Sequence, residues 1–290
     1  MSPIDRRHWP EYLIEGSGIA VFMMSACAFG TLLEHPDLPI RHAVGDPFAR
    51  RVVMGIAMGL TAMAIVYSPW GRRSGAHVNP SVTLTFLRLG KIHPADAAGY
   101  TAAQFVGGAI GVAASARLLG PPLAHPAVDY VVTMPGPAGI AVAFAAEATI
   151  SFVLMTVILW VSNSERLARS TGVFCGVLVG LYIALEAPIS GMSMNPARSL
   201  ASALAAGEWR ALWIYFTAPP LGMLAAAEVY LRLFGDEGVF CAKLHHVDDG
   251  PCIFCAYRTR RALETSVPVA ASNQANERGR LGCHRTTITT

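Results

Sequence analysis

The stretch Ser74–Pro80 reads SGAHVNP, and a matching stretch, Ser190–Pro196, reads SGMSMNP. Both follow the pattern S-G-x-x-x-N-P, and each continues into an apolar stretch that is too short to cross a bilayer. Short hydrophobic segments at corresponding positions of two membrane repeats indicate a site at mid-membrane where two half-helices meet. The repeated pattern therefore predicts a protein through which a small solute crosses a membrane.

The Asn-Pro step of each copy predicts where the half-helix begins. Proline is favoured in the first helical turn, where its missing N–H would have no partner, and Asn is a favoured cap just before it. We therefore expect half-helices to start at Pro80 and Pro196. Their positive dipole ends would point at the bilayer centre, where Asn79 and Asn195 offer N–H groups to a passing solute and cations are repelled. A single Asn-Pro would favour a capped turn, but two matched copies favour a paired site.

The composition indicates a membrane protein. Hydrophobic residues make up 53% of the 290 residues and charged residues 14%, whereas soluble domains have about 25% charged residues. Apolar runs near the spanning length of about 20 residues predict six spans and, between them, two half-spans at 79–89 and 195–206. The spans are expected at 12–32, 50–68, 97–118, 139–161, 171–189 and 210–234.

This layout divides the chain into four parts. Residues 1–11 are predicted to be a cytoplasmic N-terminus, and 12–234 a channel domain built from one repeat at about 12–118 and another at about 139–234. A Cys/His-rich cytoplasmic segment is expected at 235–265. A disordered end is expected at 266–290, which is rich in Ser, Thr, Asn, Gly and Arg.

The basic residues of the short loops predict the orientation. Arg72, Arg73, Arg88, Lys91, Arg166 and Arg169 fall on the side of the termini, and fewer basic residues fall on the other side. By the positive-inside rule both termini are expected in the cytoplasm, with the protein in an inner or plasma membrane and the first span retained as an anchor. The net charge of +3 suits cytoplasmic basic flanks and indicates no nucleic-acid partner.

The chain resembles the aquaporin, or major intrinsic protein, family of water and glycerol channels. The resemblance rests on the two Asn-Pro boxes, on Asn195–Ser199 (NPARS) and on the repeat-opening Glu15 and Glu147, and it covers about residues 11–234. It implies an all-α membrane fold, in which six helices and two re-entrant half-helices form a right-handed bundle as an inverted repeat. It also implies a homotetramer in the lipid bilayer with one pore per subunit.

The resemblance also implies roles for individual residues. The pore boxes would be Asn79, Pro80 and Ser81 in the first repeat and Asn195, Pro196 and Ala197 in the second. Arg198 would supply the cation of the selectivity constriction, and an arginine in this place is costly in lipid unless it faces a polar lumen. The other constriction positions fall on Ile183, Met192 and either Met58 or Gly59. Glu15 and Glu147 would brace the re-entrant loops by accepting backbone N–H groups, with a proton relay as the alternative.

These residues favour water as the solute. Ser199 and the pair Tyr215-Phe216 resemble the water-channel pattern, whereas Ile183 and Met192 make the constriction less polar than is usual. A facilitator of glycerol or another small neutral solute is the alternative. A proton-coupled secondary transporter or a closed-pore membrane scaffold are more remote alternatives. The sequence contains no catalytic motif that indicates an enzyme, no cofactor is expected for transport, and His77 is interpreted as a loop residue or a gate.

The tail contains a group of residues that bind soft metals. Cys241, either His245 or His246, Cys252 and Cys255 give the spacing C-x3-H-x6-C-x2-C, or x4 and x5 with the second histidine. Four such ligands in a short segment predict a zinc site, and a closed set of four would be structural. The alternative is a set of ordinary reduced thiols.

Overall fold

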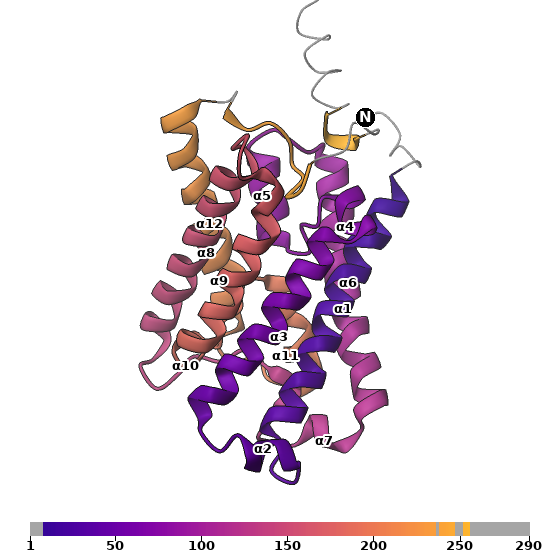
Figure 1. Cartoon of the computed structure of the whole chain (residues 1–290), viewed down its shortest axis with the longest axis vertical. Coiled ribbons are helices and arrows are strands. Elements are labelled where there is room, and N and C mark those ends of the chain that lie inside the picture. Colours follow the sequence, from indigo (N-terminus) through magenta and orange to yellow (C-terminus); the bar gives the residue numbers. More distant parts are fainter. Residues whose placement is uncertain (1–7, 236–237, 247–251, 256–290) are drawn as a thin grey trace, which may run out of the picture.

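The computed structural model describes residues 8–235, 238–246 and 252–255. In these ranges the chain is all helix, turn and loop, and it has six helices that are long and apolar enough to cross a membrane (Figure 1). These are α1 (Trp9–Glu34), α3 (Pro47–Tyr67), α6 (Pro94–Leu119), α8 (Ile140–Ser162), α9 (Thr171–Leu185) and α12 (Leu212–Phe234). Two half-helices lie between them, α5 (Pro80–Arg88) and α11 (Pro196–Ala206).

Short helices lie in the connections: α2 (Pro39–Ala43), α4 (Pro69–Ser74), α7 (Pro121–Ala124), η1 (Asp129–Val131), η2 (Ala168–Ser170) and α10 (Ala187–Ser190). Helix α1 begins and α12 ends at the same end of the bundle, at the top of Figure 1. We call this the tail end, because the described tail residues also lie there. The opposite end carries α2 and α7.

The predicted order of six spans and two half-spans is confirmed, and one boundary is wrong. The fifth span was expected to run to residue 189, but α9 ends at Leu185. The chain then turns into the four residues of α10, which contain Pro188, and stops at Gly191 with a left-handed φ of 83°. Proline inside a helix removes a backbone donor, so Pro188 prevents α9 from continuing. The apolar composition nevertheless runs on, which is why the sequence predicted a longer span.

The helices pack as an inverted repeat. In each repeat the first and third spanning helices pack together, α1 on α6 and α8 on α12, while the second helices α3 and α9 pack on each other across the repeat boundary. Each half-helix packs against the third spanning helix of the other repeat, α5 on α12 and α11 on α6. This exchange brings the first turns of α5 and α11 together inside the bundle.

Glycines permit close helix crossings, among them that of α3 on α9. A Cβ on Gly59 would lie 2.5 Å from the carbonyl oxygen of Gly176, and one on Gly55 would lie 2.4 Å from that of Gly180. No side chain fits at these distances, so the small residues set the approach of the two backbones. On the outside, spanning helices expose large apolar side chains to the bilayer, among them Leu13, Ile56, Leu60, Val106, Ile110 and Leu221.

The described tail residues are packed against the bundle. In the segment 238–246, Val239, Ala242 and Leu244 are buried, and in 252–255 Phe254 is buried. The predicted tail 235–265 is therefore in part an ordered cover of the tail end. The predicted disorder of 266–290 falls outside the described residues.

Candidate functional site

The two Asn-Pro boxes meet inside the bundle. Asn79 Oδ1 accepts the N–H of Ser81, and Asn195 Oδ1 accepts the N–H groups of Ala197 and Arg198, so each Asn caps its half-helix. Each side-chain amide also donates across to the other loop. Asn79 Nδ2 lies 2.7 Å from the carbonyl oxygen of Met194, and Asn195 Nδ2 lies 2.8 Å from that of Val78. Since an amide nitrogen carries two hydrogens, one donor on each remains for a ligand.

Glu15 holds the first re-entrant loop. Its Oε1 accepts the hydroxyl of Ser74 and the N–H of His77, and its Oε2 accepts the N–H of Val78. Gln104 of α6 also donates to Oε2, at 2.9 Å. The Glu15 carboxylate is fully buried, and these donors compensate its charge, as burial requires.

Glu147 makes the matching contacts in the second repeat. Its Oε1 accepts the hydroxyl of Ser190 at 2.7 Å and the N–H of Ser193 at 2.6 Å, and its Oε2 accepts the N–H of Met194 at 2.8 Å. Each glutamate thus supplies acceptors to backbone that belongs to no helix. Such irregular backbone is tolerated at membrane depth only where protein or a cavity satisfies it.

Both loops contain strained backbone. Non-glycine residues in the left-handed region alternate along them, with φ of 55° at Ala76, 41° at Val78, 49° at Met192 and 54° at Met194. Such conformations cost about 1–3 kcal/mol each and persist only where the surroundings enforce them. The glutamate contacts fall on or beside these residues, so the strain and its support lie at the same place.

A cavity of about 370 Å³ passes the two asparagines, and both re-entrant loops line it, over 76–79 and 191–195. Towards the opposite end its wall includes Glu34 and Arg51, and towards the tail end it includes Val66 and Leu244. Its wall is mostly apolar, with Asn79, Asn195 and Arg198 among the polar exceptions. A volume of this size accommodates many water molecules.

The predicted constriction residues are partly brought together. Met58, Ile183, Met192 and Arg198 all lie in the cavity wall, whereas Gly59 packs on α9 as described above. Arg198 Nη1 is buried and has no hydrogen-bond partner among the described residues. The four predicted constriction residues in the wall are thus three apolar side chains and one cation with a donor left for a ligand. Ser81, by contrast, lies outside the cavity wall and is buried.

Several side-chain contacts that support the loops were not predicted from the sequence. The hydroxyls of Tyr100 and Tyr215 donate to the carbonyl oxygens of Ser74 and Ser190, one in each repeat. Tyr215 therefore braces a loop instead of lining the pore. His77 is buried, with Nδ1 3.1 Å from Thr83 Oγ1 and Nε2 2.7 Å from the carbonyl oxygen of Ala242 in the tail. The only sequence signal for this bracing role is that Tyr100 and Tyr215 occupy equivalent positions in the third spanning helices of the two repeats.

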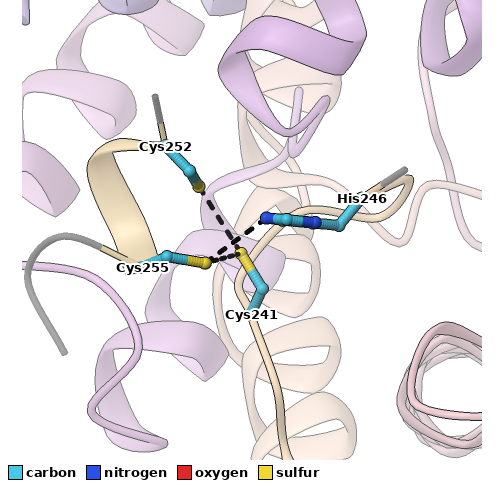
Figure 2. A group of neighbouring side chains, drawn as sticks. All are labelled: Cys241, His246, Cys252 and Cys255. Atoms are coloured by element: carbon cyan, nitrogen blue, oxygen red, sulfur yellow. Dashed lines mark hydrogen bonds between the residues drawn. The ribbon is translucent and has the colours of Figure 1, made fainter. Parts of the chain in front are cut away.

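The tail gathers four of the five predicted metal ligands (Figure 2). Cys241, His246, Cys252 and Cys255 point at one another, and their ligand atoms all lie within 4.8 Å of each other. His245 is not part of the group, and its ring packs edge-on against Tyr67. A hydrogen bond from the Cys241 thiol lowers the pKa of Cys252 and so favours its thiolate form. This Cys/His group could hold a metal ion.

Six spanning helices, two re-entrant half-helices joined at their capped N-termini and a cavity past that junction define an inverted-repeat membrane protein of the channel type. Residues 8–230 match the major intrinsic protein family. The chain belongs to this family, which is one of channels and not of enzymes.

Relatives agree with this family, and a solved structure shares the fold. The chain is 36% identical to aquaporin NIP1-1 of Arabidopsis thaliana, over 61% of this chain and 60% of that protein. It is 39% identical to aquaporin NIP3-1 of rice, Oryza sativa subsp. japonica, over 59% of this chain and 54% of that protein. The matches thus span little more than half the length of these relatives. An aquaglyceroporin from Plasmodium falciparum shares the fold, with a TM-score of 0.61 and 21% identity over 76% of this chain and 94% of that chain.

Proposed function

We propose that the protein is a passive channel for water and other small uncharged solutes. The observation that carries this proposal is the meeting of Asn79 and Asn195 in the wall of the cavity, each with a donor left at the positive end of a half-helix. Such donors orient neutral polar molecules, and the two dipole ends together with Arg198 repel cations.

A second solute class, glycerol and similar neutral molecules, is supported by the constriction. Met58, Ile183 and Met192 give it three apolar side chains beside Arg198. An apolar wall opposite a donor suits a solute with both carbon and hydroxyl surfaces, whereas water alone gains nothing from the carbon contact. We therefore include glycerol-sized solutes and propose water as the faster one.

Stopped-flow light scattering of liposomes that contain the purified protein, treated with a chelator to remove any metal bound by the tail, tests the proposal. An impermeant sugar outside should cause fast shrinkage, and a glycerol gradient should cause shrinkage followed by re-swelling faster than in empty liposomes. Shrinkage as slow as in empty liposomes would contradict a channel. Solute accumulation driven by an imposed proton gradient would indicate a coupled transporter instead.

We further propose the metal content, the assembly and the membrane orientation of this channel. Transport itself needs no cofactor. The Cys/His group of the tail holds one structural zinc ion through Cys241, His246, Cys252 and Cys255, a ligand set that zinc accepts. Four copies assemble in an inner or plasma membrane with both termini in the cytoplasm. Native mass spectrometry of the detergent-purified protein should give the mass of four chains, each with one zinc.

A further inference from the structure

The tail crosses the end of the cavity as a tethered segment. Gly238 accepts the Tyr230 hydroxyl through its carbonyl oxygen at 3.0 Å, and the Phe240 N–H donates to Asn163 Oδ1 at 2.6 Å. Further on, Ala242 accepts from His77, and the Leu244 N–H donates to the carbonyl oxygen of Gly75 at 3.1 Å. The segment 238–246 is thus bonded to the end of α8, to α12 and to the first re-entrant loop.

Leu244 is the tail residue in the cavity wall. It is 5% exposed, and towards the tail end the wall also includes Ile65, Val66, Ala76 and His77. The first three side chains are apolar, and both ring nitrogens of His77 are already hydrogen-bonded, so this part of the wall offers little to replace the hydrogen bonds that a water molecule gives up. A leucine among them therefore forms a hydrophobic closure at the tail end, of the kind that gates pores by excluding water.

The second described tail segment supports the first. Phe254 is buried and stacks on His77, with ring centroids 5.7 Å apart and planes 13° apart, and it meets Tyr100 edge-on. His77 is thereby held between Phe254 and Phe86. His77 also bonds Ala242, two residues before Leu244. Displacement of the 252–255 segment therefore removes the Phe254 ring that packs on His77 and weakens the support of the segment that carries Leu244.

The Cys/His group joins these two segments. Cys241 and His246 come from the segment that carries Leu244, and Cys252 and Cys255 come from the segment that carries Phe254 (Figure 2). The sulfur of Cys241 lies 3.7 Å from that of Cys252 and 3.6 Å from that of Cys255. Sulfurs bound to one tetrahedral zinc at bonds of 2.3 Å lie about 3.8 Å apart. Three thiolates and one imidazole are soft ligands that favour zinc and leave no open position.

We propose that zinc bound by Cys241, His246, Cys252 and Cys255 holds Leu244 in the tail-end entrance and closes the pore, and that loss of zinc opens it. This inference rests on the channel function proposed above. Metal binding supplies much of the folding free energy of short segments that have little core of their own. Zinc at ~100 times its dissociation constant shifts the ratio of closed to open tail by up to about 100-fold.

Metal content tests the site without any transport assay. Protein purified in reducing buffer without added metal should contain about one zinc per chain, and Cys252→Ser/Cys255→Ser should contain almost none. His246→Ala should lower the zinc content, whereas its neighbour change His245→Ala and the change Cys283→Ser, which lies outside the described residues, should not. Equal zinc in His246→Ala and His245→Ala, or no zinc in the parent, would overturn the assignment.

Water permeability of the full chain in liposomes then tests the closure. Chelation should raise it several-fold in the parent and leave Cys252→Ser/Cys255→Ser, already open, unchanged. Leu244→Ala should be open with its zinc still bound, which separates the closing side chain from the metal. Parent liposomes that lose their zinc and keep the same permeability would refute the gate. If every variant, Leu244→Ala included, is as impermeable as empty liposomes, the channel function fails, while the zinc contents still decide the metal site.

Discussion

At the scale of single residues, Arg198 is a cation in the cavity wall with a buried donor that has no partner among the described residues. It follows the cap of α11, its backbone N–H bonds Asn195 Oδ1, and its side chain lines the cavity, where the buried Nη1 has no partner among the described residues. A buried donor without a partner costs about 1–3 kcal/mol. A solute in the cavity that accepts from this donor removes the penalty.

Replacement of this cation should loosen the selectivity of the pore. In Arg198→Ala we expect faster passage of glycerol relative to water and a measurable leak of protons and small cations, because both the bulk and the charge of the constriction are lost. Stopped-flow scattering and a pH-sensitive dye inside the liposomes, both after chelation of bound zinc, measure the two effects. Arg210→Ala, an exposed arginine paired with Glu208, serves as the control. The same solute ratios in all three proteins would exclude Arg198 from the filter.

At the scale of elements, the re-entrant loops depend on two carboxylates whose oxygens are all in use. In Glu147→Gln one oxygen can still accept from Ser190 and Ser193, but an amide N–H₂ then faces the N–H of Met194. We expect a loss of about 1–3 kcal/mol in stability, seen as a lower midpoint of thermal unfolding in detergent. Ser190→Ala, which leaves both backbone contacts in place, should lower the midpoint less. A Gln variant as stable as the parent would mean that the charge-assisted contacts do not hold the loop.

The sequence predicted the elements better than their contacts. Two half-helices could be placed because Asn79-Pro80 and Asn195-Pro196 carry their start signals locally. The end of α9 could not, because the apolar composition runs on through α10. Spacing alone also left His245 and His246 equivalent, and nothing local indicates that Ala242 bonds His77. Contacts between segments so far apart depend on the packed bundle, which no local pattern encodes.

At the scale of the whole molecule, the distribution of charge gives the bundle a direction. The tail end carries most of the basic residues of the described chain, namely Arg72, Arg73, Arg88, Lys91, Arg166, Arg169, Arg232 and Lys243. The opposite end carries Arg41, Arg50, Arg51, Arg117 and Arg210. The positive-inside rule counts Lys and Arg near the membrane, so the tail end is expected in the cytoplasm. There thiols stay reduced, as zinc ligation by three cysteines requires.

Labelling of cysteines in cells measures this orientation. Arg210, with 80% of its side chain exposed, lies at the opposite end, and Trp70, which is 71% exposed, lies in α4 at the tail end. A membrane-impermeant maleimide should label Arg210→Cys in intact cells and Trp70→Cys only after permeabilisation. The parent chain is the control, since Cys27 and Cys175 are buried in the bundle and Cys241, Cys252 and Cys255 lie at the tail end with Trp70. Labelling of Trp70→Cys in intact cells would show that the tail end faces outward, opposite to the expected orientation. Such an inversion would place the Cys/His group outside, where disulfide formation competes with zinc, so the same experiment decides whether a metal-held closure at the tail end is chemically possible.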